Sequence, residues 1–136
     1  MSKAEKALAA SESQGFPRAY RITRKADYDA VFRGGRKRVS PYLVCYLLQK
    51  PEGNSRLGLA VSRKVGPAVI RNRVKRCLRE CFRRLRPGLT VPLDIVVVAR
   101  PACAGLSNAA LTRDFEKLLR PWREAPQGES ETDKRG

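Results

Sequence analysis

The sequence predicts an α+β fold, an α/β sandwich in which helices pack on a small mixed sheet in the order αββαβα. Three observations predict it: three segments with apolar residues at helical spacing, two strand-like runs flanking a turn-prone segment, and one continuous apolar run, PLDIVVVAR, at 92–100. A chain of 136 residues with 42% hydrophobic residues supplies one core. We therefore expect a single domain over residues 18–123, with flexible tails at 1–17 and 124–136.

The first helix is expected to follow Thr23, a candidate N-cap, and to run through RKADYDAVFR to the Gly-Gly pair at 34–35. Within it, Tyr28, Val31 and Phe32 fall on one face, because residues three and four apart lie side by side on a helix. That face is predicted to pack on the sheet.

Two strands are predicted next, RVSPYLVCYLLQ at 38–49 and SRLGLAVSR at 55–63, both rich in β-branched, aromatic and leucine residues. The segment between them, KPEGN, is typical of a turn. We expect the two strands to pair as an antiparallel hairpin.

The longest helix is predicted over GPAVIRNRVKRCLRECFRRL, residues 66–85, with Pro67 near its first turn and RPG closing it at 86–88. At 100° per residue, its apolar residues form one core-facing stripe. These residues are Ile70, Val74, Cys77, Leu78, Cys81 and Leu85.

After this helix, the apolar run at 92–100 suits a central strand that is buried on both faces. A last helix is predicted over SNAALTRDFEKLLRPW, with Ser107 or Asn108 as the N-cap and Pro121 at its end. The order of elements predicts that the helices lie on one side of the sheet.

The charge of the chain is its strongest functional signal. It has 29 Lys and Arg against 13 Asp and Glu, no histidine, and a formal net charge of +16. A field of this sign attracts nucleic acid or an anionic membrane surface. In the long helix, Glu80 is the one acid among many basic residues, and like charges four apart repel one another. This pattern favours an external polyanion over an ordinary solvated helix face.

Two further features suit an RNA partner. The N-terminus of the long helix, beside Arg63 and Lys64, predicts an anion site. The aromatic residues Tyr28, Phe32 and Tyr46 are either part of the core or a platform on which single-stranded bases stack. Basic residues surround them in the sequence, namely Arg24, Lys25, Arg33 and Arg36.

Catalytic motifs are lacking in the sequence. It contains no histidine, P-loop, Gly-rich dinucleotide turn or Cys/His pair, so we expect another component to carry any chemistry. The four cysteines have no metal-finger spacing and are predicted to be small buried thiols. No apolar run approaches the roughly 20 residues of a membrane span, and the first residues lack a signal peptide's apolar region, which predicts a cytoplasmic protein.

The segment RLGLAVSRKVGPAVIRNRVKRCLRECFR, residues 56–83, closely resembles the signature of the bacterial ribonuclease P protein subunit, an Arg-Asn-Arg helix after a basic pair and a Gly-x-Ala-Val turn. The resemblance extends over residues 20–120, through DYDAVFRGGR and DIVVVAR. It implies an α/β sandwich with a left-handed crossover between strand, long helix and strand, where the general expectation is right-handed.

The resemblance also implies a function. Members of this family bind a large catalytic RNA, and the holoenzyme removes the 5′ leader of precursor tRNA by Mg²⁺-dependent hydrolysis in an active site made of RNA. The expected partners are therefore the catalytic RNA and precursor tRNA, with no membrane and no obligate protein partner. The expected cofactor is Mg²⁺ held mainly by RNA, with no organic cofactor, no metal ligand and no catalytic residue in the protein.

By position, the implied RNA-binding motif falls on Arg63, Lys64, Arg71, Asn72, Arg73, Lys75, Arg76 and Arg79. The implied leader-binding cleft falls on Tyr28, Phe32 and Tyr46, to which we add the neighbouring Arg36.

Three positions depart from the family pattern. Tyr28 stands where phenylalanine is usual, Arg63 where lysine is frequent, and Pro67 where asparagine is common. The first two preserve stacking and charge, whereas Pro67 lacks an N–H donor. Two other functions stay open: a structural or ribosome-associated RNA-binding protein, and a peripheral membrane protein attracted to anionic lipid.

Overall fold

The computed structural model describes residues 16–123. Of the tails predicted at 1–17 and 124–136, residues 1–15 and 124–136 lie outside the described residues. Seven helices and strands form the domain, with short 3₁₀ turns between some of them. In chain order they are α2 (Lys25–Gly34), β1 (Arg36–Val39), β2 (Leu43–Gln49), β3 (Arg56–Ala60), α3 (Ala68–Leu85), β4 (Leu93–Ala99) and α4 (Asn108–Leu119).

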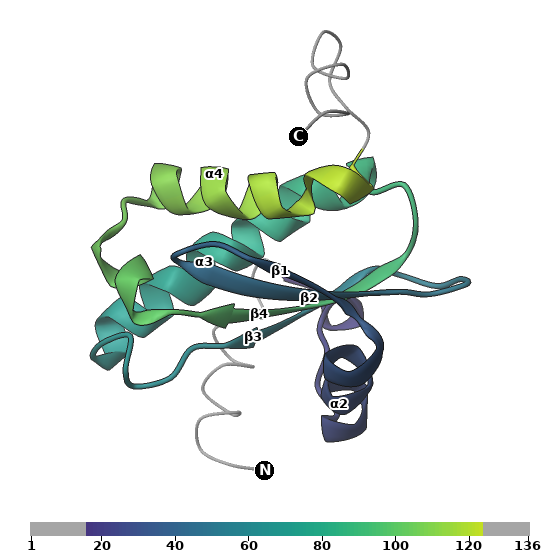
Figure 1. The fold of residues 1–136 in the computed structure, drawn as a ribbon, viewed down its shortest axis with the longest axis horizontal. Coiled ribbons are helices and arrows are strands. Elements are labelled where there is room, and N and C mark those ends of the chain that lie inside the picture. Colours follow the sequence, from purple (N-terminus) through teal and green to yellow (C-terminus); the bar gives the residue numbers. More distant parts are fainter. Residues whose placement is uncertain (1–15, 124–136) are drawn as a thin grey trace, which may run out of the picture.

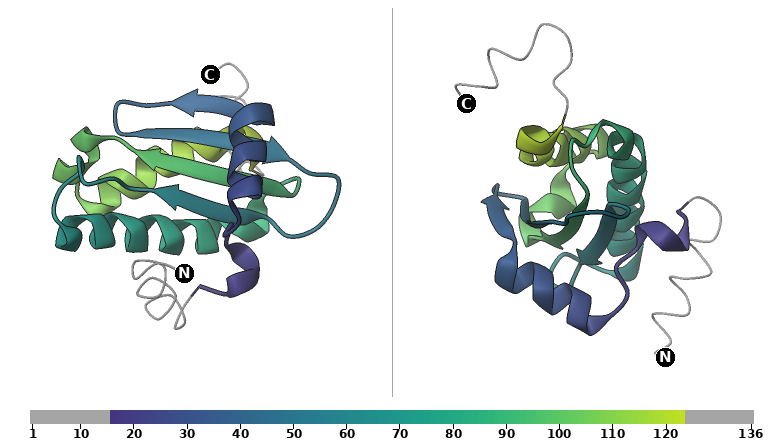
Figure 2. Two further views of the ribbon diagram at one scale, coloured as in Figure 1. Left: turned by 90° about the horizontal axis from the view of Figure 1, so that it is seen from below. Right: turned by 90° about the vertical axis from the view of Figure 1, so that its right-hand side faces the viewer.

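The four strands form one mixed sheet in the order β1-β2-β4-β3, which confirms the predicted fold class (Figure 1). β4 is antiparallel to β2 and parallel to β3. The connection from β3 through α3 to β4 is left-handed (Figure 2), as the resemblance implies and against the usual hand.

The helices cover both faces of the sheet. α3 and α4 lie on one face, and α2 crosses the other (Figures 1 and 2). The prediction that all helices lie on one side is therefore wrong. Helices lie on both faces because the residues of β4 are buried on both faces. Ile95 and Val97 belong to the main core, whereas Val96 packs under α2. A central strand that carries apolar residues on both faces needs a helix on each side.

The first predicted strand, 38–49, is in fact a hairpin of two strands. β1 and β2 pair antiparallel, with Val39 opposite Val44. Ser40 makes the turn: its backbone N–H donates to the carbonyl of Leu43 at 2.8 Å, and its hydroxyl accepts hydrogen bonds from the N–H groups of Tyr42 and Leu43. A serine at a turn competes with the strand ladder in this way.

β2 and β3 do not pair, so the predicted hairpin between them is wrong. β4 lies between them instead. The connecting loop is bound to β4, because the N–H of Lys50 donates to the carbonyl of Pro92 at 2.9 Å and the hydroxyl of Ser55 accepts from the N–H of Leu93 at 3.0 Å. The most apolar strand thereby takes the most buried position.

α2 begins at Lys25, with Arg24 rather than Thr23 at the N-cap position. Before it, the N–H of Ile22 donates to the carbonyl of Leu57 at 3.0 Å, which fixes the chain to the edge of β3. The side chains of Ile22 and Val31 pack with Val96 in a small core between α2 and the sheet.

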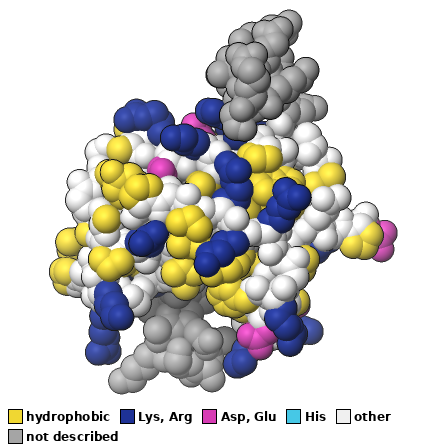
Figure 3. Space-filling model, viewed as in Figure 1, with side chains coloured by type: hydrophobic (Ala, Val, Ile, Leu, Met, Phe, Trp, Pro, Cys, Tyr) yellow, Lys and Arg dark blue, Asp and Glu magenta, His cyan; other side chains and the backbone are white. Residues whose placement is uncertain are grey.

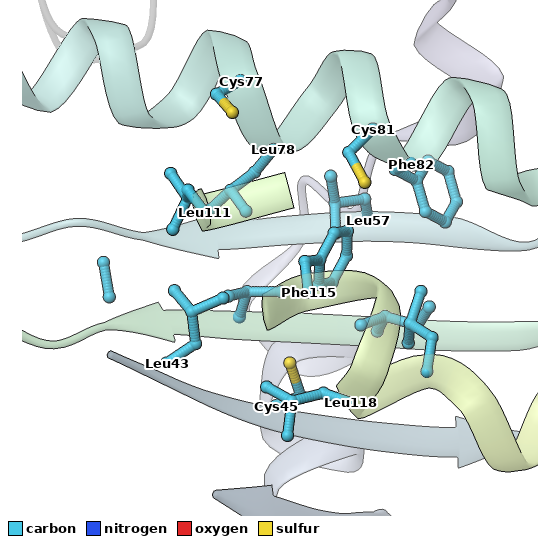
Figure 4. Packing of buried hydrophobic residues seen from close by; sticks show 14 of the residues in the cluster. Leu43, Cys45, Leu57, Cys77, Leu78, Cys81, Phe82, Leu111, Phe115 and Leu118 are labelled. Carbon is cyan, nitrogen blue, oxygen red and sulfur yellow. The ribbon is translucent and has the colours of Figure 1, made fainter. Parts of the chain in front are cut away.

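α3 contributes the predicted apolar stripe to the main core, where Val74, Leu78 and Cys81 are fully buried and Ile70 is half-buried at the helix start. The stripe also includes Phe82, which was not predicted (Figure 4). All four cysteines are free and buried, as predicted. Burial raises the pKa of Cys81 to about 12, so its thiol stays protonated and inert.

α4 begins as predicted, because the Ser107 hydroxyl accepts a hydrogen bond from the N–H of Ala110 at 3.1 Å. Its core face packs on α3 and the sheet through Leu111, Phe115 and Leu118 (Figure 4). Phe16, which falls in the segment predicted as a tail, is buried in the same core with its ring 5.9 Å from that of Phe82.

Candidate nucleic-acid interface

The exposed side of α3 and the segment before it carry the predicted basic motif. We call this the helix surface: Arg63, Lys64, Arg71, Asn72, Arg73, Lys75, Arg76 and Arg79. Arg63, Lys64, Asn72 and Arg76 are exposed, and the others are half-buried. The structure thus brings the eight predicted residues onto one helix and its N-terminal approach.

Two arginines of the helix surface are also used inside the fold. The Nε of Arg71 donates to the carbonyl of Gly66 at 3.1 Å, which closes the turn before the helix. Arg73 donates to the amide oxygen of Asn108 at 2.8 Å and to the carbonyl of Ala104 at 3.1 Å, which joins α3 to the start of α4. Both positions therefore combine charge with a structural contact.

Other cations lie at the surface of α3, where Glu80 is the one acid of the helix. Glu80 pairs with Arg83 within the helix. The side chains of Lys64 and Arg76 make no hydrogen bond or ion pair with any other residue in the described range. Lys and Arg side chains also lie among few acids on the face of the molecule drawn in Figure 3, where the sheet lies in front of α3. An arrangement of this kind attracts and binds phosphate groups.

A second surface lies on the opposite side of the sheet, where α2 crosses it. We call it the aromatic cluster: Tyr28, Phe32 and Tyr46. The Phe32 and Tyr46 rings meet edge to face with centroids 4.8 Å apart, and Phe32 is 42% exposed. Tyr28 and Tyr46 are half-buried against Val31 and Val96. The cluster therefore joins the small core on one side and leaves ring surface open to a ligand on the other.

Tyr28 lies against β3 at Gly58. A Cβ atom at residue 58 would come within 2.7 Å of the Tyr28 ring, so only glycine lets the ring approach the strand so closely. The requirement is one of space rather than of backbone conformation. Sequence reasoning missed this role, although a glycine inside a predicted strand is a known sign of close approach.

We expect Gly58→Ala to lower the free energy of unfolding by about 1–3 kcal/mol, since the added methyl group forces Tyr28 or β3 to move. Urea denaturation measures this. Gly105→Ala is the matched control, because a Cβ there meets nothing within 4 Å. Equal stability of the two variants would contradict the close packing of Tyr28 on β3.

Arg36, predicted beside the aromatic cluster, lies elsewhere. It is in register with Leu47, whose side chain faces the main core, so alternation places Arg36 on the other face of the sheet from Tyr46. The cation at the cluster is Lys37, whose Nζ lies 5.9 Å from the centre of the Tyr46 ring. The one-residue offset follows from the strand register, which sequence position alone does not fix.

A buried ion-pair network lies beside the cluster on the same face of the sheet. Asp94 of β4 is 4% exposed, and its carboxylate accepts from Arg56 Nε at 3.0 Å and Nη2 at 2.7 Å and from Lys50 Nζ at 2.9 Å. Burial alone would raise the pKa of Asp94, but the hydrogen bonds from Arg56 and Lys50 outweigh it and hold the pKa below its ordinary value. Asp94 is therefore ionised at neutral pH.

The described residues contain no group of three or more His, Cys, Asp or Glu side chains that could hold a metal ion. Arg56 bridges the two acids Asp27 and Asp94. Within residues 16–123, no helix is long and apolar enough to cross a membrane.

Comparison with known proteins gives one consistent result. The ribonuclease P family model matches residues 16–123. The ribonuclease P protein component of Thioalkalivibrio sulfidiphilus is 44% identical over 107 residues, which cover 77% of this chain and 88% of the relative. That of Desulfovibrio desulfuricans is 42% identical over 108 residues, covering 76% and 83%.

Solved structures agree. The Staphylococcus aureus RNase P protein has a TM-score of 0.70 at 31% identity, over 76% of this chain and 95% of that one. The RNase P protein of Thermotoga maritima has a TM-score of 0.68 at 29% identity, over 76% and 98%. The family match over the whole described range, the identities and the shared fold lead to one conclusion: the chain belongs to the family of ribonuclease P protein components.

Proposed function

We propose that the helix surface binds the catalytic RNA of ribonuclease P, while the aromatic cluster holds the single-stranded 5′ leader of precursor tRNA. The observation that carries this proposal is the presence of two chemically different surfaces on opposite faces of one sheet. One is a row of basic side chains on a rigid helix, and the other is a set of partly exposed rings.

The helix surface suits a folded RNA. With 18 residues, α3 is about 27 Å long, so its cations meet phosphates along an extended backbone. Arginine predominates, and its planar guanidinium donates two parallel hydrogen bonds to a phosphate. The helix carries no exposed aromatic residue for base stacking, so its contacts are with the RNA backbone.

The aromatic cluster suits a single strand. Unpaired bases stack on aromatic rings without requiring one sequence, and each such contact contributes about 1–3 kcal/mol. The exposed ring of Phe32 is available for this, with Lys37 and Arg33 near enough in the chain to attract the backbone. Mature tRNA lacks the leader, so this surface distinguishes precursor from product.

Mg²⁺ is assigned to the RNA. The carboxylates beside the cluster are bound to Arg56 and Lys50, and no described group of ligands fits the ion. When bound to the RNA, Mg²⁺ supplies the activation of water and the charge stabilisation that phosphodiester hydrolysis requires. The protein's cations reduce repulsion where the phosphates of RNA and substrate meet, which lowers the concentration of Mg²⁺ that the holoenzyme needs.

Phe32→Ala is expected to weaken binding of precursor tRNA to the holoenzyme by about 1–3 kcal/mol, through loss of one stacking contact, and to leave mature tRNA binding unchanged. Equilibrium binding of both RNAs at one salt concentration measures the difference. Val69→Ala is the control, because Val69 is likewise apolar and exposed but lies on α3. An equal loss for both RNAs would show that Phe32 does not read the leader.

The proposal as a whole is tested by single-turnover cleavage of 5′-labelled precursor tRNA at low Mg²⁺ by a bacterial ribonuclease P RNA, with and without this protein. Strong stimulation at the mature 5′ end is expected. If the protein binds the RNA but stimulates cleavage with none of several ribonuclease P RNAs that are active at high Mg²⁺, the structural or ribosome-associated RNA-binding function replaces this one.

A further inference from the structure

Arg56 connects the helix that carries the aromatic cluster to the centre of the sheet. Its Nε and Nη2 donate to Asp94 on β4, and its Nη1 donates to the carboxylate of Asp27 on α2 at 3.4 Å. One guanidinium on β3 thus binds an acid of the sheet and an acid of the helix. Asp27 immediately precedes Tyr28, the first member of the cluster.

Apolar and aromatic packing supplies further contacts between α2 and the sheet. α2 crosses the strands (Figure 2), with Tyr28 against Gly58 of β3, Val31 against Val96 of β4 and Phe32 against Tyr46 of β2. The middle contact is buried and apolar, so it resists separation but does little to resist rotation of the helix about it. The ion pair at the first turn of the helix opposes that rotation.

We propose that Asp27, acting through Arg56, is a positioning residue for leader recognition: it fixes the angle of α2 and so the relative placement of Tyr28, Phe32 and Tyr46. This inference rests on the proposed role of the cluster in leader binding. Arg56 is itself held by Asp94, in a bidentate pair whose carboxylate is buried. The guanidinium of Arg56 is therefore held firmly by Asp94, and its contact with Asp27 is the more exposed of the two.

A purely electrostatic role and a positioning role of Asp27 predict opposite changes in the affinity for precursor tRNA when the charge of Asp27 is removed. Since RNA is a polyanion, deleting an acid near its binding surface strengthens binding of any RNA. If Asp27 acts only through its charge, Asp27→Asn binds precursor and mature tRNA more tightly. If it holds α2 in place, the same change weakens binding of the precursor relative to mature tRNA.

The experiment measures the ratio of the affinities of the holoenzyme for precursor and mature tRNA. We expect Asp27→Asn to lower this ratio about three- to fivefold, as suits a partly exposed ion pair. Asp29→Asn removes an equal charge from the same helix and is expected to leave the ratio unchanged, because Asp29 pairs only with the exposed Lys25 among the described residues. Asp27→Glu keeps the charge and can span the 3.4 Å contact, so it is expected to retain most of the native affinity ratio.

Two results would overturn the inference: a ratio unchanged in Asp27→Asn, whatever its unfolding temperature, or an equal fall in Asp29→Asn. Asp27 also lies in the first turn of α2, where any acid favours the helix. The Arg56→Lys variant separates this effect of charge at the helix start from action through Arg56. When Asp27→Asn is made in the Arg56→Lys variant, we expect the affinity ratio to change by much less than in the native protein. An undiminished change of the ratio would contradict action through Arg56. Phe32→Ala is assayed in parallel. If it leaves the ratio unchanged, the proposed leader site fails; if it alone lowers the ratio, only the positioning role fails.

Discussion

Replacing Lys64 and Arg76 together by glutamate is expected to weaken assembly with the catalytic RNA about 100-fold at moderate salt. Both side chains project from the helix surface without a partner among the described residues, so their loss leaves the fold intact. Each charge-assisted contact to a phosphate contributes about 1.5 kcal/mol, and two of them amount to roughly two powers of ten. The slope of log K against log salt concentration is expected to fall by about two, one for each lost phosphate contact.

The matched control is the double reversal of Arg113 and Lys117, which are exposed on α4 and undergo the same change in charge. It is expected to lower affinity only slightly, through the general field of the protein. Filter binding over a range of salt concentrations measures both quantities. If the two double variants lose equal affinity, net charge rather than the helix surface governs assembly. Arg71 and Arg73 are less suitable positions, because each also bonds within the fold.

Asp94→Asn is expected to lower the free energy of unfolding by about 3 kcal/mol, the largest effect on stability that we predict. The change leaves Arg56 and Lys50 without their buried counter-charge, and both keep some contact with water, which places the cost at the lower end for such pairs. Chemical denaturation at neutral pH measures it. Asp29→Asn is the control for an exposed pair, with an expected cost of at most about 0.5 kcal/mol.

The same carboxylate makes stability depend on pH. Because the pKa of Asp94 in the folded protein lies below its unfolded value, its contribution is complete above about pH 5 and is lost as the pH falls through the ordinary aspartate range towards the folded pKa. The difference in unfolding free energy between the native protein and Asp94→Asn is therefore expected to narrow as the pH is lowered from 6 to 3. A difference that stays constant would show that Asp94 is not ionised in the fold.

Much of the architecture follows from local patterns. The helices were predicted within a few residues because their apolar spacing and the Ser107 cap act locally. The pairing of the strands was not predicted correctly, because it depends on competition between segments far apart in the chain. The turn at KPEGN favours pairing of β2 with β3, but β4, which is apolar on both faces, excludes that pairing because it takes the central place.

The candidate site was likewise predicted only in part. The basic face of α3 could be predicted because helical periodicity fixes which residues share a side. The position of Lys37 rather than Arg36 at the aromatic cluster could not be predicted, because it depends on the register of β1 against β2. The network around Asp94 was also missed, because it joins residues up to 44 positions apart and no spacing rule brings them together.

The central position of β4 has a consequence for the timing of folding in the cell. β2 and β3 have no bonds to each other, and their common neighbour is the last strand to be made. At about 5–20 residues per second, the ribosome takes roughly 2–8 s to extend the chain from the end of β3 to the end of β4. Until then Val31 has no Val96 to pack on, and α2 has no platform. A nascent chain of this strongly basic protein thus emerges beside ribosomal RNA without its aromatic cluster, which assembles only when synthesis of the domain is nearly complete.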